Sequence, residues 1–181
     1  MSGETARTAL VVVADAAEDV LAPWRTRYNA SAVERRIPSH VTILFPLVPA
    51  AEAEDDLLSE LRGLYRPLAP FAYELSRLET FPGVAWLAPD PAAPFHALIE
   101  RTRAAFPQCP PYGDHGLEPV PHCTVGVTEE ARALEAMVAE LRSGLGPATP
   151  ICCEATAVAL LAEHADGTWS TRAAFPFEGP G

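Results

Sequence analysis

Two short segments decide how this sequence folds: His40-Val41-Thr42-Ile43-Leu44-Phe45 and His122-Cys123-Thr124-Val125-Gly126-Val127. Each is a histidine, a spacer and a threonine opening a mainly apolar run, and each closely follows a proline. Side chains alternate between the two faces of a β-strand, so imidazole and hydroxyl share one face and the spacer lies on the other. The alternative is a pair of structural histidines at strand starts. The matching flanks favour one site built from two strands, one in each half of the chain.

The remaining periodicity predicts an α+β fold with largely antiparallel sheets. Helices are expected over 19–29, 51–65, 94–106 and 129–141. Strands are expected over 10–13, 40–48, 71–78, 84–87, 155–162 and 171–177, together with the second motif. An Asp166-Gly167 turn predicts a hairpin between the last two strands. Segments 31–39 and 107–121 are expected to be loops. Each motif strand is followed by a helix and then by strands, so the two halves echo each other.

The size and composition are those of a globular domain. The chain has 181 residues, of which 49% are hydrophobic and 20% charged. We expect one domain of two lobes over residues 1–181. No apolar run approaches the roughly 18 residues of a membrane span, which predicts a soluble, cytoplasmic protein without a membrane partner. The four cysteines include no CxxC pair, so reduced thiols are expected and a metal site is not.

The charge distribution limits the kinds of partner. Every basic residue is an arginine, and the net charge is −11. Such a field repels long duplex nucleic acid, which proteins usually bind through a basic face. Four arginines nevertheless gather just before the first motif, at Arg25, Arg27, Arg35 and Arg36. They are either a solvated loop or an anion-attracting rim, and the rim would favour a small phosphorylated ligand or an RNA end.

The motifs carry a family resemblance. The chain resembles the two-histidine phosphoesterase superfamily, in its 2′-5′ RNA ligase-like branch, through its two His-x-Thr motifs. Supporting segments lie along most of the chain: Trp24-Arg25 with Tyr28, 38–46, 81–89 and Pro110-Pro111-Tyr112-Gly113. The resemblance implies a bilobal fold with a pseudo-twofold axis. Two antiparallel sheets would form a cleft that carries both motifs, with the helices outside.

Two histidines can cleave a cyclic phosphodiester without a metal or any other cofactor. One neutral imidazole acts as general base on water, and the other, protonated, acts as general acid on the leaving oxygen. His40 and His122 are the expected catalytic pair, with either one as the base. The hydroxyls of Thr42 and Thr124 would donate to the non-bridging phosphate oxygens.

Three further residues are expected to bind substrate. Arg25 and Tyr28 are predicted at the mouth of the cleft. Tyr112 is predicted either to stack on a base or to pack in its loop.

The sequence leaves three functions open. The first is a metal-independent phosphoesterase acting on 2′,3′-cyclic phosphates or related cyclic phosphodiesters of nucleotides or RNA ends, with 2′-5′ ligation as its reverse reaction. The second is a non-catalytic binder of phosphorylated nucleotides or RNA ends. The third is a metal-dependent hydrolase, for which the sequence offers no plausible set of three or four ligands. We expect a monomer whose only partner is its small substrate or an RNA terminus.

Overall fold

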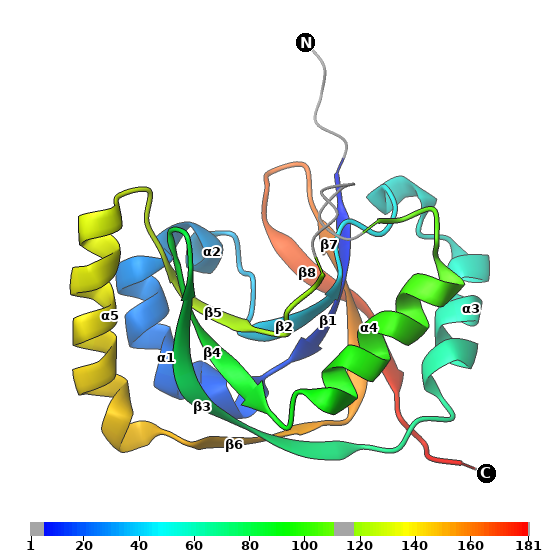
Figure 1. The fold of residues 1–181 in the computed structure, drawn as a ribbon. Coiled ribbons are helices and arrows are strands. Elements are labelled where there is room, and N and C mark those ends of the chain that lie inside the picture. The colour runs from blue at the N-terminus through cyan, green and yellow to red at the C-terminus, as the bar shows by residue number, and fades with distance from the viewer. Residues whose placement is uncertain (1–5, 111–117, 181) are drawn as a thin grey trace.

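The computed structural model describes residues 6–110 and 118–180, in which the chain forms two four-stranded antiparallel sheets (Figure 1). The first sheet has the order β2-β1-β7-β8 and the second β5-β4-β3-β6. The strands are β1 (Thr8–Val13), β2 (His40–Leu44), β3 (Phe71–Phe81), β4 (Val84–Asp90), β5 (Cys123–Val127), β6 (Ile151–Ala155), β7 (Ala157–Glu163) and β8 (Trp169–Pro176). The helices are α1 (Asp15–Tyr28), α2 (Ala30–Glu34), α3 (Asp55–Tyr65), α4 (Ala93–Ala105) and α5 (Ala131–Leu145), with 3-10 turns at Ala50–Glu52 and Gly146–Ala148. This confirms the predicted α+β class with two antiparallel sheets.

The two motif strands occupy equivalent places. β2 and β5 are each an edge strand, and each pairs with the strand that precedes it in the chain, β1 or β4. In both halves one or two helices connect the paired strands, α1 and α2 in the first half and α4 in the second. The edges carrying the motifs also contact each other, because β2 packs against β5 (Figure 1). The pseudo-symmetric order therefore brings together segments that lie nearly half the chain apart.

Two helices pack on the sheet that carries the other half's motif. α1 follows β1 in sequence but packs on β5 and β6 of the second sheet, whereas α4 follows β4 and packs on β2 of the first. α3 packs on β8, and α5 packs on β3 and β4. One large hydrophobic cluster accordingly includes fully buried side chains of both sheets, such as Leu10 of β1 and Leu75 of β3. Burial of this shared apolar surface holds the two motif strands in fixed relative positions.

The structure corrects three expectations for individual elements. The first helix was expected to start at position 19, but α1 begins at Asp15, so that Pro23 lies inside it. The favourable position of Asp15 and Glu18 in the first turn supports the earlier start. The arginine-rich segment expected to be a loop contains the short helix α2. The strand expected over 155–162 is β7, and β6 before it belongs to the other sheet.

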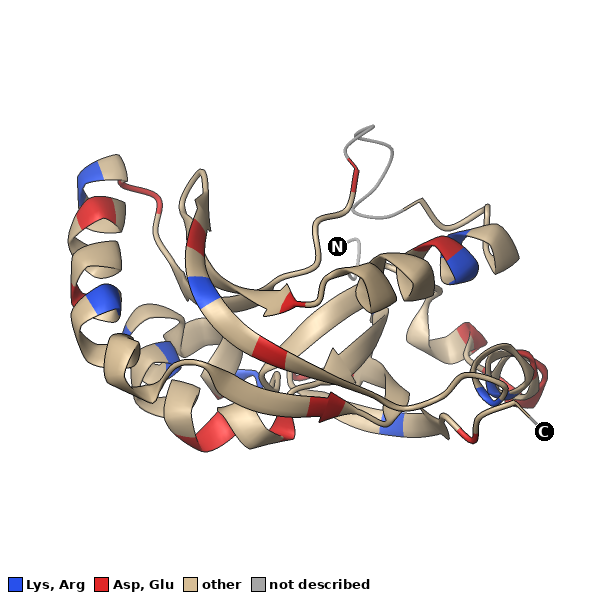
Figure 2. Ribbon diagram, turned by 60° about the horizontal axis from the view of Figure 1, so that its bottom comes forward, with Lys and Arg blue, Asp and Glu red and all other residues tan. Residues whose placement is uncertain are grey.

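Charged residues of both signs are dispersed over the helices and several strands (Figure 2). On β3, for example, Glu74, Arg77 and Glu79 are exposed and alternate in sign. Among the described residues, no helix combines the length and apolar character needed to cross a membrane.

Candidate functional site

Both motifs show the same pattern of burial along their strands. The histidine and the threonine are partly exposed, the spacer is buried, and the two residues after the threonine are buried. This pattern holds for His40-Val41-Thr42 at the start of β2 and for His122-Cys123-Thr124, of which His122 directly precedes β5. The alternation predicted from the sequence is confirmed: each strand presents an imidazole and a hydroxyl on one face and anchors itself through the other.

The buried spacer of the second motif contacts the first motif. Burial raises the pKa of the Cys123 thiol to about 12, and the backbone of His40 lies close enough to lower it in part. Cys123 is therefore an uncharged packing residue at the junction of β2 and β5. The histidines are near enough for a charge on His122 to lower the pKa of His40.

The two imidazoles are held in the same way. Nδ1 of His40 lies 2.7 Å from the carbonyl oxygen of Pro38, and Nδ1 of His122 lies 2.7 Å from that of Val120. A carbonyl can only accept a hydrogen bond, so Nδ1 carries the proton and donates in both residues. In the neutral imidazoles Nε2 then bears the lone pair. Each motif thus fixes one tautomer through the carbonyl two residues before its histidine.

Both histidines favour the neutral form in the free protein. Burial is the largest cause and lowers the pKa of His40 and of His122 below the ordinary value of 6.5. The charges of Arg25 and His122 lower the pKa of His40 further, while the backbone hydrogen bonds act in the opposite direction. Because a proton on one imidazole disfavours a proton on the other, the pair titrates as a coupled unit.

Two aromatic side chains hold the ring of His122. The Phe81 ring, at the end of β3, meets it edge-on at a centroid distance of 5.1 Å, and the Trp86 ring of β4 lies 5.8 Å away. Trp86 is only 7% exposed. It fills the core and also contacts His122, a role that sequence pattern alone does not distinguish from simple packing.

The threonine hydroxyls are available to a ligand. Within the described part of the chain, neither Thr42 nor Thr124 has a side-chain hydrogen-bond partner, and both are partly exposed. Each lies two residues after its histidine on the same strand face.

Arg25 lies beneath the first motif rather than at the mouth of a cleft. It is 2% exposed, and its Nη1 donates to Glu18 at 3.0 Å and to Ser39 Oγ at 3.1 Å. Its Nη2 donates to the carbonyl oxygen of Ile37. Glu18 in turn accepts from the backbone N–H of Ser39 at 2.7 Å. The segment that leads into His40 is therefore held by an ion pair on α1, in which Arg25 is buried and Glu18 is 43% exposed. The burial of Arg25 does not favour its predicted contact with substrate.

The other two residues predicted to bind substrate fall in different places. Tyr28 is partly exposed on α1, and its hydroxyl donates to Glu140 of α5 at 2.6 Å. This hydrogen bond is the largest cause that raises the pKa of Tyr28. Tyr112 lies outside the described residues. Substrate binding by Tyr28 and Tyr112 stays a prediction.

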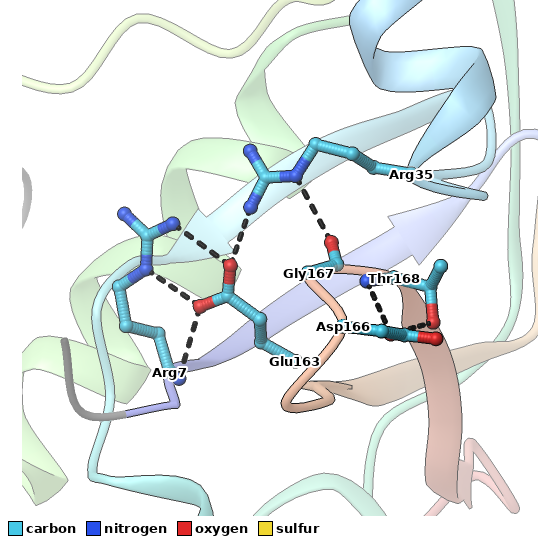
Figure 3. Close-up of polar contacts among 6 residues, drawn as sticks. All are labelled: Arg7, Arg35, Glu163, Asp166, Gly167 and Thr168. Atoms are coloured by element: carbon cyan, nitrogen blue, oxygen red, sulfur yellow. Dashed lines mark hydrogen bonds and ion pairs between the residues drawn. The ribbon is translucent and has the colours of Figure 1, made fainter. Parts of the chain in front are cut away.

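The arginines before the first motif do not form a common rim. Arg25 is turned inward, Arg27 pairs with Glu140, and Arg35 pairs with Glu163. Arg35 also lines a cavity of about 270 Å³ that opens beside His40 and Thr42. The sequence analysis missed Arg7 and Glu163, which lie beside this cavity. Their hydrogen bond spans 156 positions (Figure 3), and no local pattern signals such a pairing.

No group of three or more histidine, cysteine or acidic side chains in residues 6–110 and 118–180 is arranged to hold a metal ion.

The chain that carries these paired motifs also matches a known family. The family model described as the 2′-5′ RNA ligase superfamily matches residues 13–167, and the chain belongs to that superfamily. The family is one of phosphoesterase- and ligase-type enzymes.

Solved structures share the fold across nearly their whole length. The protein TT0787 of Thermus thermophilus is 19% identical, with a TM-score of 0.59 over 96% of this chain and 98% of that one. E. coli LigT, in its complex with ATP, is 17% identical, with a TM-score of 0.64 over 96% and 99%. A structure described as a phosphoesterase is 16% identical, with a TM-score of 0.65 over 96% and 99%. A search of curated proteins found no match.

Proposed function

We propose that this protein is a metal-independent phosphoesterase that hydrolyses 2′,3′-cyclic phosphates or related cyclic phosphodiesters of nucleotides or RNA ends. It acts as one two-lobed domain over residues 1–181, as a cytoplasmic monomer that needs no cofactor. The observation that carries the proposal is the matched pair of imidazoles. His40 and His122 each have Nδ1 tied to a carbonyl and Nε2 left to exchange a proton.

The mechanism divides two proton transfers between these histidines. A neutral imidazole takes a proton from water as the water oxygen bonds to phosphorus. The other imidazole, protonated, gives its proton to the ester oxygen as the P–O bond to that oxygen breaks. A bound phosphodiester supplies a negative charge that favours the second imidazole's proton. The hydroxyls of Thr42 and Thr124 donate to the non-bridging oxygens, whose charge increases in the transition state. With the 5′-hydroxyl of an RNA end in place of water, the same two proton transfers join it to the cyclic phosphate: the 5′-oxygen bonds to phosphorus as it loses its proton, and the P–O3′ bond breaks as the 3′-oxygen gains one, which leaves a 2′-5′ linkage.

Two further facts support the proposal. The chain belongs to a superfamily named for 2′-5′ RNA ligases. E. coli LigT, with which it shares a fold, has been crystallised with 3′-AMP and with phosphate. Both ligands contain the phosphate group that the paired motifs are proposed to hold.

The direct test is hydrolysis of adenosine 2′,3′-cyclic phosphate in the presence of a chelator. His40→Ala and His122→Ala should each lose roughly 10²- to 10⁴-fold in kcat, the usual contribution of a general acid or base. Glu178→Gln, which removes an exposed carboxylate paired with Arg66, serves as the control and should retain wild-type activity. Full activity of His40→Ala would sink the proposal.

A non-catalytic binder of phosphorylated nucleotides or RNA ends is the second candidate. It rests on the same two motifs, which would hold a phosphate without turning it over. Such a protein would bind adenosine 2′-phosphate in calorimetry and yet leave the cyclic phosphate intact over hours.

A further inference from the structure

The two imidazoles are tied to a carbonyl oxygen in the same way, but only His122 is also bounded by aromatic rings. Among the described residues, no aromatic side chain makes a ring contact with His40. The approach to His40 is instead held by polar contacts such as the one between Arg25 and Ser39. The two halves of the site therefore position their histidines by different means.

A single hydrogen bond does not fix the plane of an imidazole. The bond from Nδ1 to the carbonyl oxygen of Val120 holds one atom of the His122 ring. The torsion that turns a histidine ring about its attachment to Cβ is soft, so the ring can still tilt about this bond. In addition, β5 is an edge strand, hydrogen-bonded to a neighbouring strand on one side only. Further contacts are needed to set the direction of Nε2.

Phe81 and Trp86 supply these contacts. Their rings are stacked on each other, with centroids 4.7 Å apart and planes inclined by 26°. The imidazole of His122 stands at 89° to the Phe81 ring, 5.1 Å away, and at 64° to the Trp86 ring, 5.8 Å away. Steep contacts of this kind are a favoured geometry for flat rings. We call this stacked pair of rings, Phe81 and Trp86, the aromatic wall.

The backbone holds the aromatic wall beside the second motif. The register of the second sheet places Trp86 of β4 opposite Thr124 of β5, and directly opposed residues point to the same side of a sheet. The β3–β4 turn is tied to the residue after β5, because the N–H of Thr128 donates to the carbonyl oxygen of Gly83 at 2.8 Å. Gly83 has a positive φ of 76°, and a Cβ there would lie 2.5 Å from the carbonyl oxygen of Thr128. Phe81, at the end of β3, is thereby fixed relative to the motif.

Trp86 has a feature that packing alone does not explain. Its indole N–H is buried and has no hydrogen-bond partner among the described residues. A buried donor without a partner loses its hydration and gains no bond in return, so an apolar side chain of similar size would pack here more favourably. The large flat face that the indole presents to Phe81 and His122 accounts for a tryptophan at this position.

We propose that Phe81 and Trp86 are positioning residues for His122. The aromatic wall holds the imidazole in the orientation in which Nε2 exchanges a proton with the phosphodiester, and it acts through the histidine rather than by touching the substrate. This inference rests on the proposed function and adds to it two residues that serve one histidine of the pair. Because the first motif has no such wall, its loss should disturb His122 and leave His40 unchanged.

The first experiment compares Phe81→Leu with Phe71→Leu in the hydrolysis of adenosine 2′,3′-cyclic phosphate. Both phenylalanines are partly buried on β3 and contact other aromatic rings, but Phe71 contacts no histidine. A small displacement of a catalytic group can cost about 10²-fold, so Phe81→Leu should lower kcat by roughly 10- to 100-fold and keep KM within about threefold. Phe71→Leu should keep both constants within about threefold of the wild type.

Two kinetic outcomes would overturn the positioning role. A raised KM with an unchanged kcat would show that Phe81 contacts the substrate instead of acting through His122. Unchanged values of both constants would show that the ring is not needed. Phe81→Met repeats the test with an unbranched side chain, and circular dichroism confirms that each variant is folded.

Free imidazole tests whether the aromatic wall orients a ring. His122→Gly opens a space bounded by the wall and the carbonyl oxygen of Val120. Added imidazole should raise the rate of this variant by at least about tenfold, because a positioned base is far more effective than a diffusing one. Rescue should be largely lost in the His122→Gly, Phe81→Leu double variant and kept in His122→Gly, Phe71→Leu. Equal rescue of the two double variants would count against the wall.

Nitrogen NMR of the ligand-free protein gives a readout that does not depend on turnover. The ring nitrogens report the tautomer, and both histidines should show the Nδ1–H form in the wild type. Phe81→Leu should admit the other tautomer at His122 and leave His40 unchanged, whereas Phe71→Leu should alter neither. Unchanged His122 signals in Phe81→Leu would refute the inference. A wild-type protein that shows these NMR changes and yet hydrolyses no cyclic phosphodiester would overturn the proposed function and leave the wall as the element that orients His122.

Discussion

The two histidines are alike in their hydrogen bonds but differ in their surroundings. Both have Nδ1 bound to the carbonyl oxygen two residues earlier. His40 lies within range of the charge of Arg25 and lines the cavity, whereas the ring of His122 packs in T-shaped contacts with Phe81 and Trp86. A phosphodiester between them would thus meet two chemically identical groups in unequal environments. Unequal environments give two such groups different pKa values, so that one can act as the acid and the other as the base.

The pH dependence of activity follows from the lowered pKa values. The proposed mechanism needs one neutral and one protonated imidazole, so kcat/KM should follow a bell-shaped curve set by the free protein. Since burial lowers both pKa values below 6.5, we expect the maximum below about pH 6.5 and a decline toward neutral and alkaline pH. Initial rates at low substrate concentration measure this curve. A flat profile from about pH 5 to about pH 9 would contradict the mechanism.

The threonine hydroxyls give a second test at the scale of single residues. Thr42→Val and Thr124→Val keep the branched shape and remove the proposed donor to phosphate. A hydrogen bond to a charged group is worth about 1.5–3 kcal/mol, so each variant should lose roughly 10- to 150-fold in kcat/KM. Thr42→Ser and Thr124→Ser retain a hydroxyl and should keep most of the activity. Valine variants that match the wild-type rate would show that the hydroxyls do not contact the phosphate.

The residues of the candidate site were predictable only where their signal is local. His40-Val41-Thr42 and its counterpart on β5 could be found because strand alternation links positions two apart. The partners of Arg25 could not be predicted. In the sequence Glu18 is an ordinary acidic residue of a first helical turn, and its contact with the segment 37–39 depends on how α1 packs. Burial of Arg25 likewise has no sequence signature, since an arginine before a motif is compatible with an exposed rim or an internal ion pair.

At the scale of elements, α1 holds the approach to β2 through this ion pair. Arg25→Met should lower kcat by roughly 10- to 100-fold, because small displacements of a catalytic group are costly, and should leave an unpaired Glu18 beside Ser39. Arg27→Met removes an exposed arginine from the same helix and should have little effect, as exposed ion pairs contribute at most about 1 kcal/mol. Steady-state kinetics and circular dichroism separate misplacement from unfolding. Equal activity of the two variants would exclude this positioning role for Arg25.

β5 approaches α1 and α5 so closely that one position admits only glycine. A Cβ at Gly126 would lie 2.4 Å from the sulfur of Met137 and 2.8 Å from Cβ of Tyr28. Gly126→Ala should therefore destabilise the protein by about 1–3 kcal/mol in urea denaturation. Gly63→Ala on α3 is the control, since nothing lies within 4 Å of its new methyl group. It should stabilise the helix by about 0.5–1 kcal/mol. A neutral Gly126→Ala variant would show that β5 can move away from α1.

Most elements were predictable, and the failures have physical causes. α3, α4 and α5 repeat apolar residues at helical spacing over three or more turns, a signal that survives small errors at the ends. β6 was missed because its five residues, Ile-Cys-Cys-Glu-Ala, are buried alternately but do not alternate in polarity: Cys152 is an apolar residue at an exposed position. Its assignment to the second sheet depends on pairing with β3, which no local pattern encodes.

At the scale of the molecule, the packing that joins the halves also desolvates the site. Helices α1 and α4 each cross to the other sheet, and the junction of β2 and β5 lies between them. The order of elements in the sequence suggested the pseudo-symmetry, but it did not suggest that α1 and α4 pack on the opposite sheets. Helix periodicity shows which face of a helix is apolar, and it does not show which sheet covers that face. The same burial that holds the strands together lowers the pKa of both histidines.

This coupling predicts how the free energy of unfolding depends on pH. In the unfolded chain His40 and His122 bind protons near pH 6.5, whereas the folded protein binds them only at lower pH. Their contribution is therefore fully present well above pH 6.5 and is lost as the pH falls from 6.5 through the lowered folded values. Glu163, whose pKa is lowered from 4.5, loses its contribution only at more acidic pH and does not affect this range.

Urea denaturation at about pH 7.5 and about pH 5.5 measures the loss. The wild-type protein should lose more stability between these values than the His40→Gln, His122→Gln double variant, whose side chains do not titrate. Thr42→Val, which leaves both imidazoles in place, should behave like the wild type. An identical loss in the double variant would mean that the histidines are not desolvated by the junction of the two sheets. The same outcome would remove the basis for an activity maximum below pH 6.5, since both expectations depend on the lowered pKa values.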